Sequence, residues 1–238
     1  MTYTRDMPRN TLTREQIVRA AIELLDAEGV DGLSMRCLGN RLGSAATAVY
    51  WHVKSKDDLV VLAGDEVWGE IELPDPSEVG WRTAATRMAN DTYAMINRHL
   101  WLVPAMSTHL IYGPGKARYD DHSLAVYEAA GFTGGNADWA LKALHSVFTF
   151  VLGMALAEAA EVAWRTRLRR DGGNEEEQIR DALARASDIA MQFPQLRTRI
   201  EALGDADLTA PPDQSFAFGL QAILDGLEAQ LAARPMPA

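Results

Sequence analysis

The chain has 238 residues, of which 47% are hydrophobic and 24% charged, and its formal net charge is -10. This composition is typical of a globular protein with a sizeable core, and it excludes a disordered chain, a collagen and a low-complexity filament. A single cysteine, Cys37, excludes a disulfide scaffold and a cysteine-rich zinc module, and it favours a cytoplasmic protein. No uninterrupted apolar run reaches about 18 residues, so we expect no membrane span. Residues 1–10 lack the apolar segment of a signal peptide.

The charge is unevenly distributed along the chain. Residues 1–56 contain eight Lys and Arg against six Asp and Glu, whereas residues 57–238 contain 15 against 27. A mildly basic head on an acidic body is typical of a small DNA-reading module attached to a larger domain that does not bind DNA. Ordinary fluctuation gives the same asymmetry, so the charge leaves both interpretations open.

The first part of the sequence predicts four helices. Apolar residues between Ile17 and Leu25 recur on one face of a helix, which Thr13 and Gln16 open as a capping box. Ser55 caps the fourth helix, because a hydroxyl at this position accepts from an N–H group of the first turn. The expected helices cover about residues 13–28, 34–42, 45–52 and 55–72.

The remaining sequence predicts six further helices, separated by segments rich in glycine and proline. The breaks include Gly113-Pro114-Gly115, Gly134-Gly135 and the loop-like residues 204–213. The expected helices cover about residues 77–98, 100–112, 116–130, 136–170, 175–192 and 214–233. No segment shows a strict alternation of apolar and polar residues, so the expected fold class is all-α, with about ten helices.

Residues 34–52 have the pattern of a helix-turn-helix, because a tight turn at Gly43 joins two short helices. The second helix, about 10 Å long at 1.5 Å per residue, is short for a core helix but can enter a major groove about 12 Å wide. Its small side chains would let the backbone approach the bases, while His52, Lys54 and Lys56 could hold phosphates. A plain helical hairpin has the same pattern, and the pattern alone does not separate the two.

The segment Tyr50–Leu59, with the sequence YWHVKSKDDL, resembles the end of the recognition helix and the start of the next helix in the TetR family of bacterial repressors. The resemblance is to the tetracycline-binding branch, and it continues in order along nearly the whole chain. The other matching segments are Ala20–Leu25, Gly29–Ser34, Leu38–Gly43, Gly131–Phe132, Phe150–Gly153, Phe216–Leu220 and Gly226–Leu231. The resemblance implies a homodimeric repressor, whose residues 1–56 bind DNA and whose residues 57–238 bind a ligand and dimerise.

The resemblance also implies which residues contact a palindromic, double-stranded operator. The matching positions are Arg36, Ala46, Thr47, Ala48, Tyr50, Trp51 and Lys56, and Lys54 adds a possible phosphate contact. Arg36 is the best candidate for a base contact, because arginine can form two hydrogen bonds with guanine. Thr47 could contact a thymine methyl or a phosphate, and Trp51 could pack under the helix or face the DNA. Ala46 and Ala48 replace larger side chains, so we expect a different operator sequence.

Two apolar helix faces are candidates for a dimer interface. The same faces form if the two helices only fill the core of their own chain, and the residue pattern leaves this alternative open. The resemblance favours a four-helix interface formed by residues 136–170 and 214–233 of two subunits. The expected interface residues are Leu144, Val151, Leu152, Ala155, Phe216, Leu220, Ile223, Leu227 and Leu231.

The middle of the chain is rich in Met, Trp, Tyr and His, which suit the wall of a pocket for a lipophilic, ring-bearing molecule. Taken singly, each such residue is more often part of the core. Positions counted from landmarks shared with the family add further polar and apolar candidates. The expected ligand-binding residues are Trp68, Glu72, Met88, Thr92, Met106, His109, Ser123, Trp139, His145 and Phe148.

The sequence predicts no metal ion and no cofactor. Met106 stands where the tetracycline-binding members of the family have a histidine that coordinates drug-bound magnesium, and a thioether does not suit that ion. His99, His109 and His145 are scattered and lack the spacing of a metal site. We therefore expect an effector other than tetracycline with magnesium.

Catalytic motifs are absent from the sequence, which contains no nucleophile elbow, phosphate loop or H-E-x-x-H segment. Glu158 and Glu161, three residues apart on a helix, are more typical of a solvated face than of a metal site. We expect a cytoplasmic, non-enzymatic repressor that a small lipophilic molecule releases from DNA and that does not bind membranes. The alternative is an all-α lipophile-binding protein or enzyme without DNA binding, which a failure to bind genomic fragments would favour.

Overall fold

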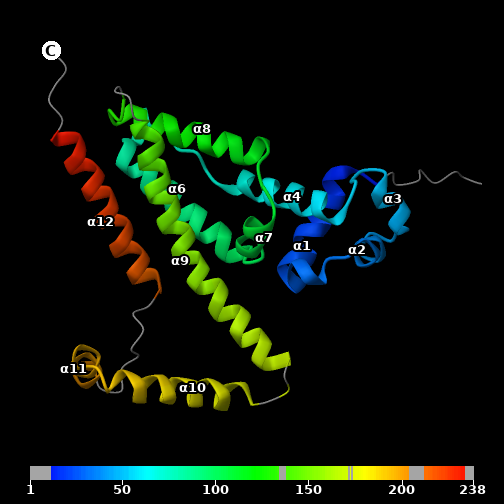
Figure 1. Ribbon diagram of the computed structural model, residues 1–238. Helices are drawn as coiled ribbons and strands as arrows, with labels where there is room; N and C mark the ends of the chain where they lie inside the picture. Colours follow the sequence, from blue (N-terminus) through cyan, green and yellow to red (C-terminus); the bar gives the residue numbers. More distant parts are fainter. Residues whose placement is uncertain (1–11, 134–137, 171, 173, 204–211, 234–238) are drawn as a thin grey trace, which may run out of the picture. The chain divides into compact units, whose positions relative to one another are not determined.

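The structure, a computed structural model, describes residues 12–133, 138–170, 172, 174–203 and 212–233. Over these residues the chain forms α-helices and one 3-10 turn and no strand, which confirms the all-α prediction (Figure 1). The expectations for residues 1–10, for the Gly134-Gly135 break and for most of the loop at 204–213 lie outside the described residues.

Contacts between residues divide the chain into two units, residues 1–130 and 131–238. The first unit contains α1 (Arg14–Gly32), α2 (Met35–Arg41), α3 (Ala46–Tyr50), α4 (Lys56–Val67), η1 (Trp68–Glu70), α5 (Pro76–Val79), α6 (Trp81–Arg98), α7 (Leu102–Thr108) and α8 (Pro114–Ala129). The second contains α9 (Trp139–Arg170), α10 (Glu175–Ala190), α11 (Pro194–Leu203) and α12 (Pro212–Ala232). The predicted domain boundary after residue 56 lies inside the first unit, because α4 contacts both α1 and α8. That boundary stays a prediction.

The first four helices form the N-terminal head of the first unit. Thr13 accepts a hydrogen bond from the backbone N–H of Gln16, whose side chain accepts one from the N–H of Thr13, so the predicted capping box is present. Gly39 allows a close approach of the backbone, because a Cβ at this position would lie 2.9 Å from the carbonyl oxygen of Ser44. The buried apolar residues of the head include Ile17, Ala21, Leu25, Leu38, Val49 and Leu59.

Several helices have bounds that differ from the prediction. The chain passes through Gly29 with a non-helical φ of 71°, and one further turn carries α1 to Gly32. The helix predicted over residues 77–98 is divided into α5 and α6 by Gly80, whose φ of 78° is favoured by glycine alone. The helix predicted over residues 55–72 ends at Val67 and continues as a 3-10 turn. α11 was not predicted from the sequence.

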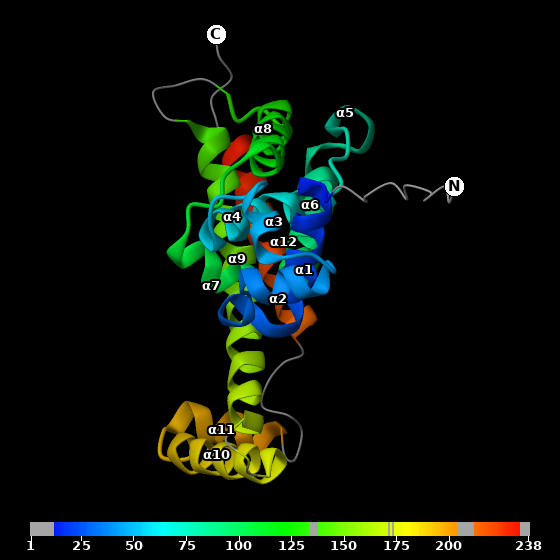
Figure 2. The same ribbon diagram turned by 90° about the vertical axis from the view of Figure 1, so that its right-hand side faces the viewer.

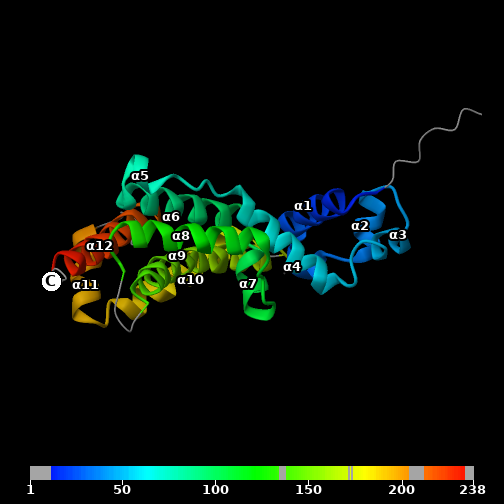
Figure 3. The ribbon, with the colours of Figure 1, turned by 90° about the horizontal axis from the view of Figure 1, so that it is seen from above.

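α4 connects the head to the rest of the first unit, since it contacts α1, α7 and α8 (Figure 3). The carboxylate of Asp65 on α4 accepts hydrogen bonds from the backbone N–H groups of Gly115 at 3.1 Å and Lys116 at 2.9 Å. These N–H groups belong to the first turn of α8 and have no partner within their own helix. α4 is therefore fastened to the start of α8 by the cap of that helix.

In the second unit, α9 and α12 lie side by side (Figures 1 and 2). The rings of Phe150 and Phe216 are 5.6 Å apart between the two helices. Of the predicted interface residues, Leu152, Ile223 and Leu231 keep part of their surface exposed. The others are buried in the single chain and have little surface left for a partner, namely Leu144, Val151, Ala155, Phe216, Leu220 and Leu227.

Within the described chain, α9 is long and apolar enough to cross a membrane by length and composition. The most apolar 18-residue window of α9 has a mean hydropathy of 1.6. No uninterrupted apolar run in the chain reaches 18 residues. One such helix is weak evidence for a membrane span, because core helices pass the same test. The contact of α9 with α12 gives its apolar residues a partner within the chain.

Candidate DNA interface and ligand-binding region

The predicted DNA-binding residues lie on α2, on α3, on the segment that leads into α4 and at Lys56, the first residue of α4. Trp51 is 87% exposed, so its indole does not pack under the helix, and of the two alternatives only the outward-facing one agrees with the structure. The exposed members of the set are Arg36, Thr47, Tyr50, Trp51 and Lys54, and the partly exposed ones are Ala46, Ala48 and Lys56. All eight are accessible to a ligand outside the head.

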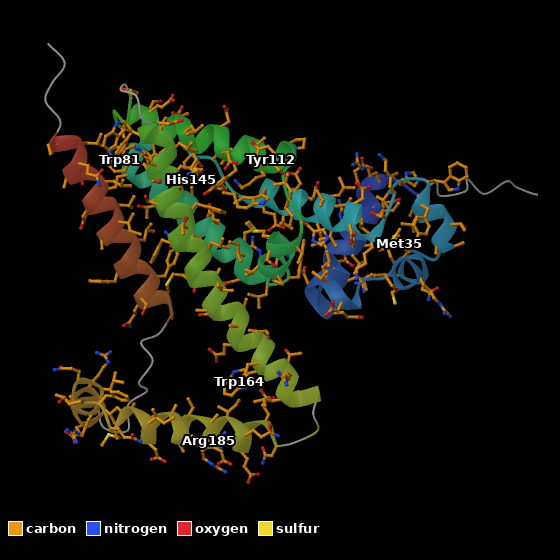
Figure 4. All side chains as sticks on the ribbon, viewed as in Figure 1. Met35, Trp81, Tyr112, His145, Trp164 and Arg185 are labelled. Carbon is orange, nitrogen blue, oxygen red and sulfur yellow. The ribbon has the colours of Figure 1, made fainter. Side chains whose placement is uncertain are left out.

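Local hydrogen bonds hold these segments in place. The Ser34 hydroxyl accepts from the backbone N–H of Cys37 at 3.1 Å and so begins α2, where Met35 is buried (Figure 4) and Arg36 is exposed. At the start of α4, Ser55 accepts from the N–H of Asp58 at 3.0 Å. These caps fix the backbone of the first turns of α2 and α4. Each of the two turns carries one cationic side chain, Arg36 on α2 and Lys56 on α4.

An aromatic cluster occupies the interior of the first unit and contains several of the predicted ligand-binding residues. The ring of Trp68 lies 4.9 Å from that of Tyr119. Thr92 donates to the carbonyl of Met88 at 2.7 Å and lies 3.3 Å from the Tyr119 hydroxyl. Ser123 donates to the carbonyl of Tyr119 at 2.8 Å. The structure therefore brings η1, α6 and α8 together through Trp68, Met88, Thr92 and Ser123, all of which are buried.

Tyr119 belongs to this cluster but is not among the predicted ligand-binding residues. Its position four residues before Ser123, on the same helix face, is the signal that could have identified it. Burial raises the pKa of the Tyr119 phenol, although hydrogen bonds with Thr92 and Ser123 oppose this effect. Lys116 lies 5.0 Å above the ring of Trp68 and pairs with Asp120. The cluster thus combines flat aromatic surfaces with neutral hydroxyl groups and one cation.

The other predicted ligand-binding residues lie outside this cluster. Glu72 is exposed, whereas Met106 and His109 are partly exposed. The His109 ring faces Asp57 at the start of α4, and the two side chains are 3.4 Å apart. Trp139, His145 and Phe148 belong to α9 in the second unit, where His145 is exposed (Figure 4). Lys142 stacks on the Trp139 ring at 5.4 Å. The predicted set is therefore divided between the two units.

Among the described residues, no group of three or more His, Cys, Asp or Glu side chains could hold a metal ion. His109 and Met106 lie on or next to α7, and His99 ends α6. The ring nitrogens of His99 and His109 form hydrogen bonds with neighbouring side chains. These histidines therefore have structural partners in the chain.

Two family models match this chain. The model for bacterial regulatory proteins of the tetR family matches residues 17–63, which include the helix-turn-helix, and the tetracycline repressor-like C-terminal domain matches residues 73–231. The chain belongs to the TetR family. Because the proteins of this family are transcriptional regulators, the prediction that the chain is not an enzyme is confirmed.

The relatives of this TetR-family regulator include proteins of Saccharopolyspora and Streptomyces. An HTH-type transcriptional regulator of Saccharopolyspora erythraea is 40% identical over 154 residues, which span 65% of this chain and 63% of the relative, less than two thirds of either. The HTH-type transcriptional repressor DrrR1 of Streptomyces coeruleorubidus is 32% identical over 95% of this chain and 81% of its own. The structure of the TetR-family protein ActR of Streptomyces coelicolor in complex with actinorhodin has a TM-score of 0.72 and 27% identity, and covers 94% of this chain and 98% of ActR.

Proposed function

We propose that this TetR-family regulator is a cytoplasmic, homodimeric repressor that binds a palindromic operator and leaves it when a small lipophilic molecule binds. The observation that carries the proposal is the exposed set of side chains on a helix-turn-helix that the family model covers. Arg36 can read a base edge from the first turn of α2, and Tyr50, Lys54 and Lys56 can hold phosphates. Trp51, exposed beside them, adds a large surface for sugar or base contacts.

The dimer is proposed to form through the exposed apolar sides of α9 and α12. The inner sides of these helices are buried in the single chain, whereas Phe218 on α12 is 79% exposed and Leu156 on α9 is 54% exposed. An exposed phenylalanine and leucine on adjacent helices are typical of a surface that a second copy covers. A two-fold dimer would also match the symmetry of a palindromic operator.

The effector is proposed to be a small lipophilic, ring-bearing molecule. ActR is solved with actinorhodin and also with (S)-DNPA, and both bound structures resemble this chain. The aromatic cluster offers this chain the aromatic surfaces and hydroxyl groups that such a molecule would need. We propose that tetracycline with magnesium is not the effector, because Met106 is a poor magnesium ligand.

Release of DNA is proposed to act through α4. At 1.5 Å per residue the 12 residues of α4 span about 18 Å, from the head to the cap of α8. The two reading helices of a dimer must lie about 34–36 Å apart to enter successive major grooves. A ligand that tilts α4 changes this spacing, and it weakens operator binding by its difference in affinity for the two states.

Selection of genomic DNA fragments on the purified chain tests this function. We expect enrichment of fragments with an inverted repeat whose half-sites are about one helical turn apart, and protection of that repeat in a footprint. Enrichment of fragments that contain no inverted repeat would contradict the proposal that a dimer binds a palindromic operator. Retention of no fragment above a random-sequence control would contradict DNA recognition and favour a lipophile-binding protein that does not bind DNA.

A further inference from the structure

A buried histidine joins three elements of the first unit. His99, at the end of α6, is 6% exposed and lies between two carboxylates. Its Nδ1 is 2.7 Å from Oδ1 of Asp26 on α1, and its Nε2 is 3.1 Å from Oε1 of Glu70 in η1. The indole N–H of Trp101 donates to the same Asp26 oxygen at 2.7 Å, and Arg98 donates to the second oxygen of Glu70 at 2.7 Å. We call these five residues the clasp.

The charges of the clasp support one another. Ionised carboxylates only accept hydrogen bonds, and Asp26 and Glu70 each face one ring nitrogen of His99. Partial burial raises the pKa of Glu70, but the hydrogen bonds and charges of Arg98 and His99 outweigh burial and lower that pKa overall. Asp26 accepts from both His99 and Trp101. Arg98 and Glu70 form an ion pair, and hydrogen bonds between charged groups are shorter and stronger than neutral ones.

The clasp joins the head to other elements of the first unit. Asp26 belongs to α1 of the head, Glu70 to η1 after α4, and His99 follows the last residue of α6. α6 also carries Met88 and Thr92 of the aromatic cluster. α4 attaches the head to the rest of the first unit through its contacts with α7 and α8. The clasp adds a second attachment at α1, and a body that is held at two places follows the motion of its support.

We propose that the clasp passes the displacement caused by an effector from α6 and η1 to the DNA-reading head. This inference rests on the proposed function, and His99 acts in it as a positioning residue. With the clasp intact, α1 moves together with the end of α6. Without it, the effector still binds, but the head follows α4 alone and its orientation is less tightly set.

The first test needs neither an effector nor DNA. Cys37 is the single cysteine of the chain and is exposed on α2, so a spin label there and a second at Ala94→Cys on α6 report the distance between head and body. Dilution with unlabelled Cys37→Ser chains leaves only distances within one chain. We expect His99→Gln and Asp26→Asn to broaden the distance distribution measured by pulsed electron paramagnetic resonance.

The matched control is Glu23→Gln. Glu23 is also a carboxylate on α1 and pairs with Arg41 at 2.6 Å, but this pair lies within the head. We expect its distribution to equal that of the parent chain. Equal widths for the parent, the control and both clasp variants would overturn the proposal. If either clasp variant fails to fold, Glu70→Gln replaces it, because the Glu70 side chain is 38% exposed.

The second test measures transmission directly, with actinorhodin as the probe. Operator affinity is measured with and without saturating actinorhodin, and actinorhodin affinity is measured without DNA. We expect His99→Gln to reduce the effect of actinorhodin on operator affinity by about tenfold, because a lost link lowers the coupling between two sites. Probe affinity and the control variant should keep the parent values. A variant that loses only thermal stability and keeps the full actinorhodin effect would show a purely structural role and overturn the proposal.

The two tests separate this inference from the proposed function. A parent protein that binds its operator but ignores actinorhodin contradicts the proposed effector class, while the distance measurement still decides the clasp. A parent protein that responds to actinorhodin, with clasp variants that respond equally, contradicts the clasp and leaves the proposed function in place.

Discussion

Arg36 and Trp51 are exposed on neighbouring parts of the helix-turn-helix, and their exposure is what makes them available to DNA. The residue pattern leaves open whether the indole of Trp51 packs under its helix, because an aromatic ring suits either place. Burial decides the question, since Val49 and not Trp51 fills the space beneath α3. At the scale of single residues, contact with the core therefore separates the structural members of a motif from the accessible ones.

Replacement of Arg36 with alanine should weaken operator binding by about 1–3 kcal/mol and relax the preference at one base pair, because the arginine can pair with a base edge. Lys56→Ala should instead lower the slope of log affinity against log salt by about 1, at all sequences alike. Fluorescence anisotropy with the selected operator at several salt concentrations measures both effects. Arg87→Ala, an exposed arginine on α6, is the control. If Arg36→Ala matches that control, the placement of the base contact is wrong.

Asp91 on α6 provides a prediction about pH. Burial and the nearby charge of Glu72 raise its pKa, so the ionised carboxylate destabilises the folded state above the ordinary pKa. Asp91→Asn should therefore raise the midpoint of thermal unfolding at neutral pH. The advantage should shrink as the pH falls through the raised pKa, because the parent carboxyl group then takes up a proton.

Asp75 is the control of opposite sign. Hydrogen bonds from the side chain and backbone of Ser77 lower the pKa of Asp75, so its carboxylate stabilises the folded state at neutral pH. Asp75→Ala should lower the unfolding midpoint at neutral pH, and this deficit should disappear as the pH falls through the lowered pKa. A stabilising Asp75→Ala, or a destabilising Asp91→Asn, would contradict the electrostatic argument.

At the scale of helices, caps and apolar faces could be predicted because their signals are local. The capping box of Thr13 and the cap at Ser55 need only residues three positions apart. The clasp could not be predicted, because Asp26 and His99 are 73 residues apart and no pattern in either helix refers to the other. The aromatic cluster was found in part, since residue type suggested Trp68 but nothing local paired it with Tyr119.

The apolar face of α12 shows what the spacing of apolar residues cannot determine, namely which of two adjacent residues is buried. The predicted dimer interface includes Ile223, which keeps part of its surface in the single chain, whereas the neighbouring Leu224 is fully buried. Leu224 therefore belongs to the face that packs within the chain, and the place of Ile223 at a dimer interface stays a prediction. Both positions are aliphatic, so the sequence alone does not choose between them. Packing against α9 determines that Leu224 is the buried residue. The same packing leaves Phe218 exposed on another side of α12.

This geometry makes a prediction about dimerisation. Phe218→Glu and Leu156→Glu should convert the dimer to a folded monomer, because each places a charge on an exposed apolar surface proposed to meet its copy. Leu220→Glu should instead unfold the second unit, since Leu220 is 1% exposed in the single chain. Sedimentation velocity and circular dichroism separate the two outcomes. Folded dimers of both surface variants would show that the interface lies elsewhere.

At the scale of the whole molecule, the proposed binding of a palindromic operator requires two copies of the chain on one piece of DNA. A single head with a five-residue reading helix, α3, offers few base contacts, so one half-site alone would bind weakly. Two heads on a two-fold axis add their contacts, and their spacing becomes the quantity that an effector can change. Dimer formation, operator symmetry and ligand response are then consequences of one arrangement.

The most direct test of this account is the affinity and mass of the complex between the unmodified chain and its selected operator. Light scattering should give two chains for each palindromic duplex, or a multiple of two. Anisotropy should show binding at least about a thousandfold tighter than to a scrambled duplex of equal length. A duplex that carries one half-site should bind far more weakly than the palindrome. A complex with one chain per duplex, or equal affinity for the palindrome and the scrambled sequence, would contradict the account.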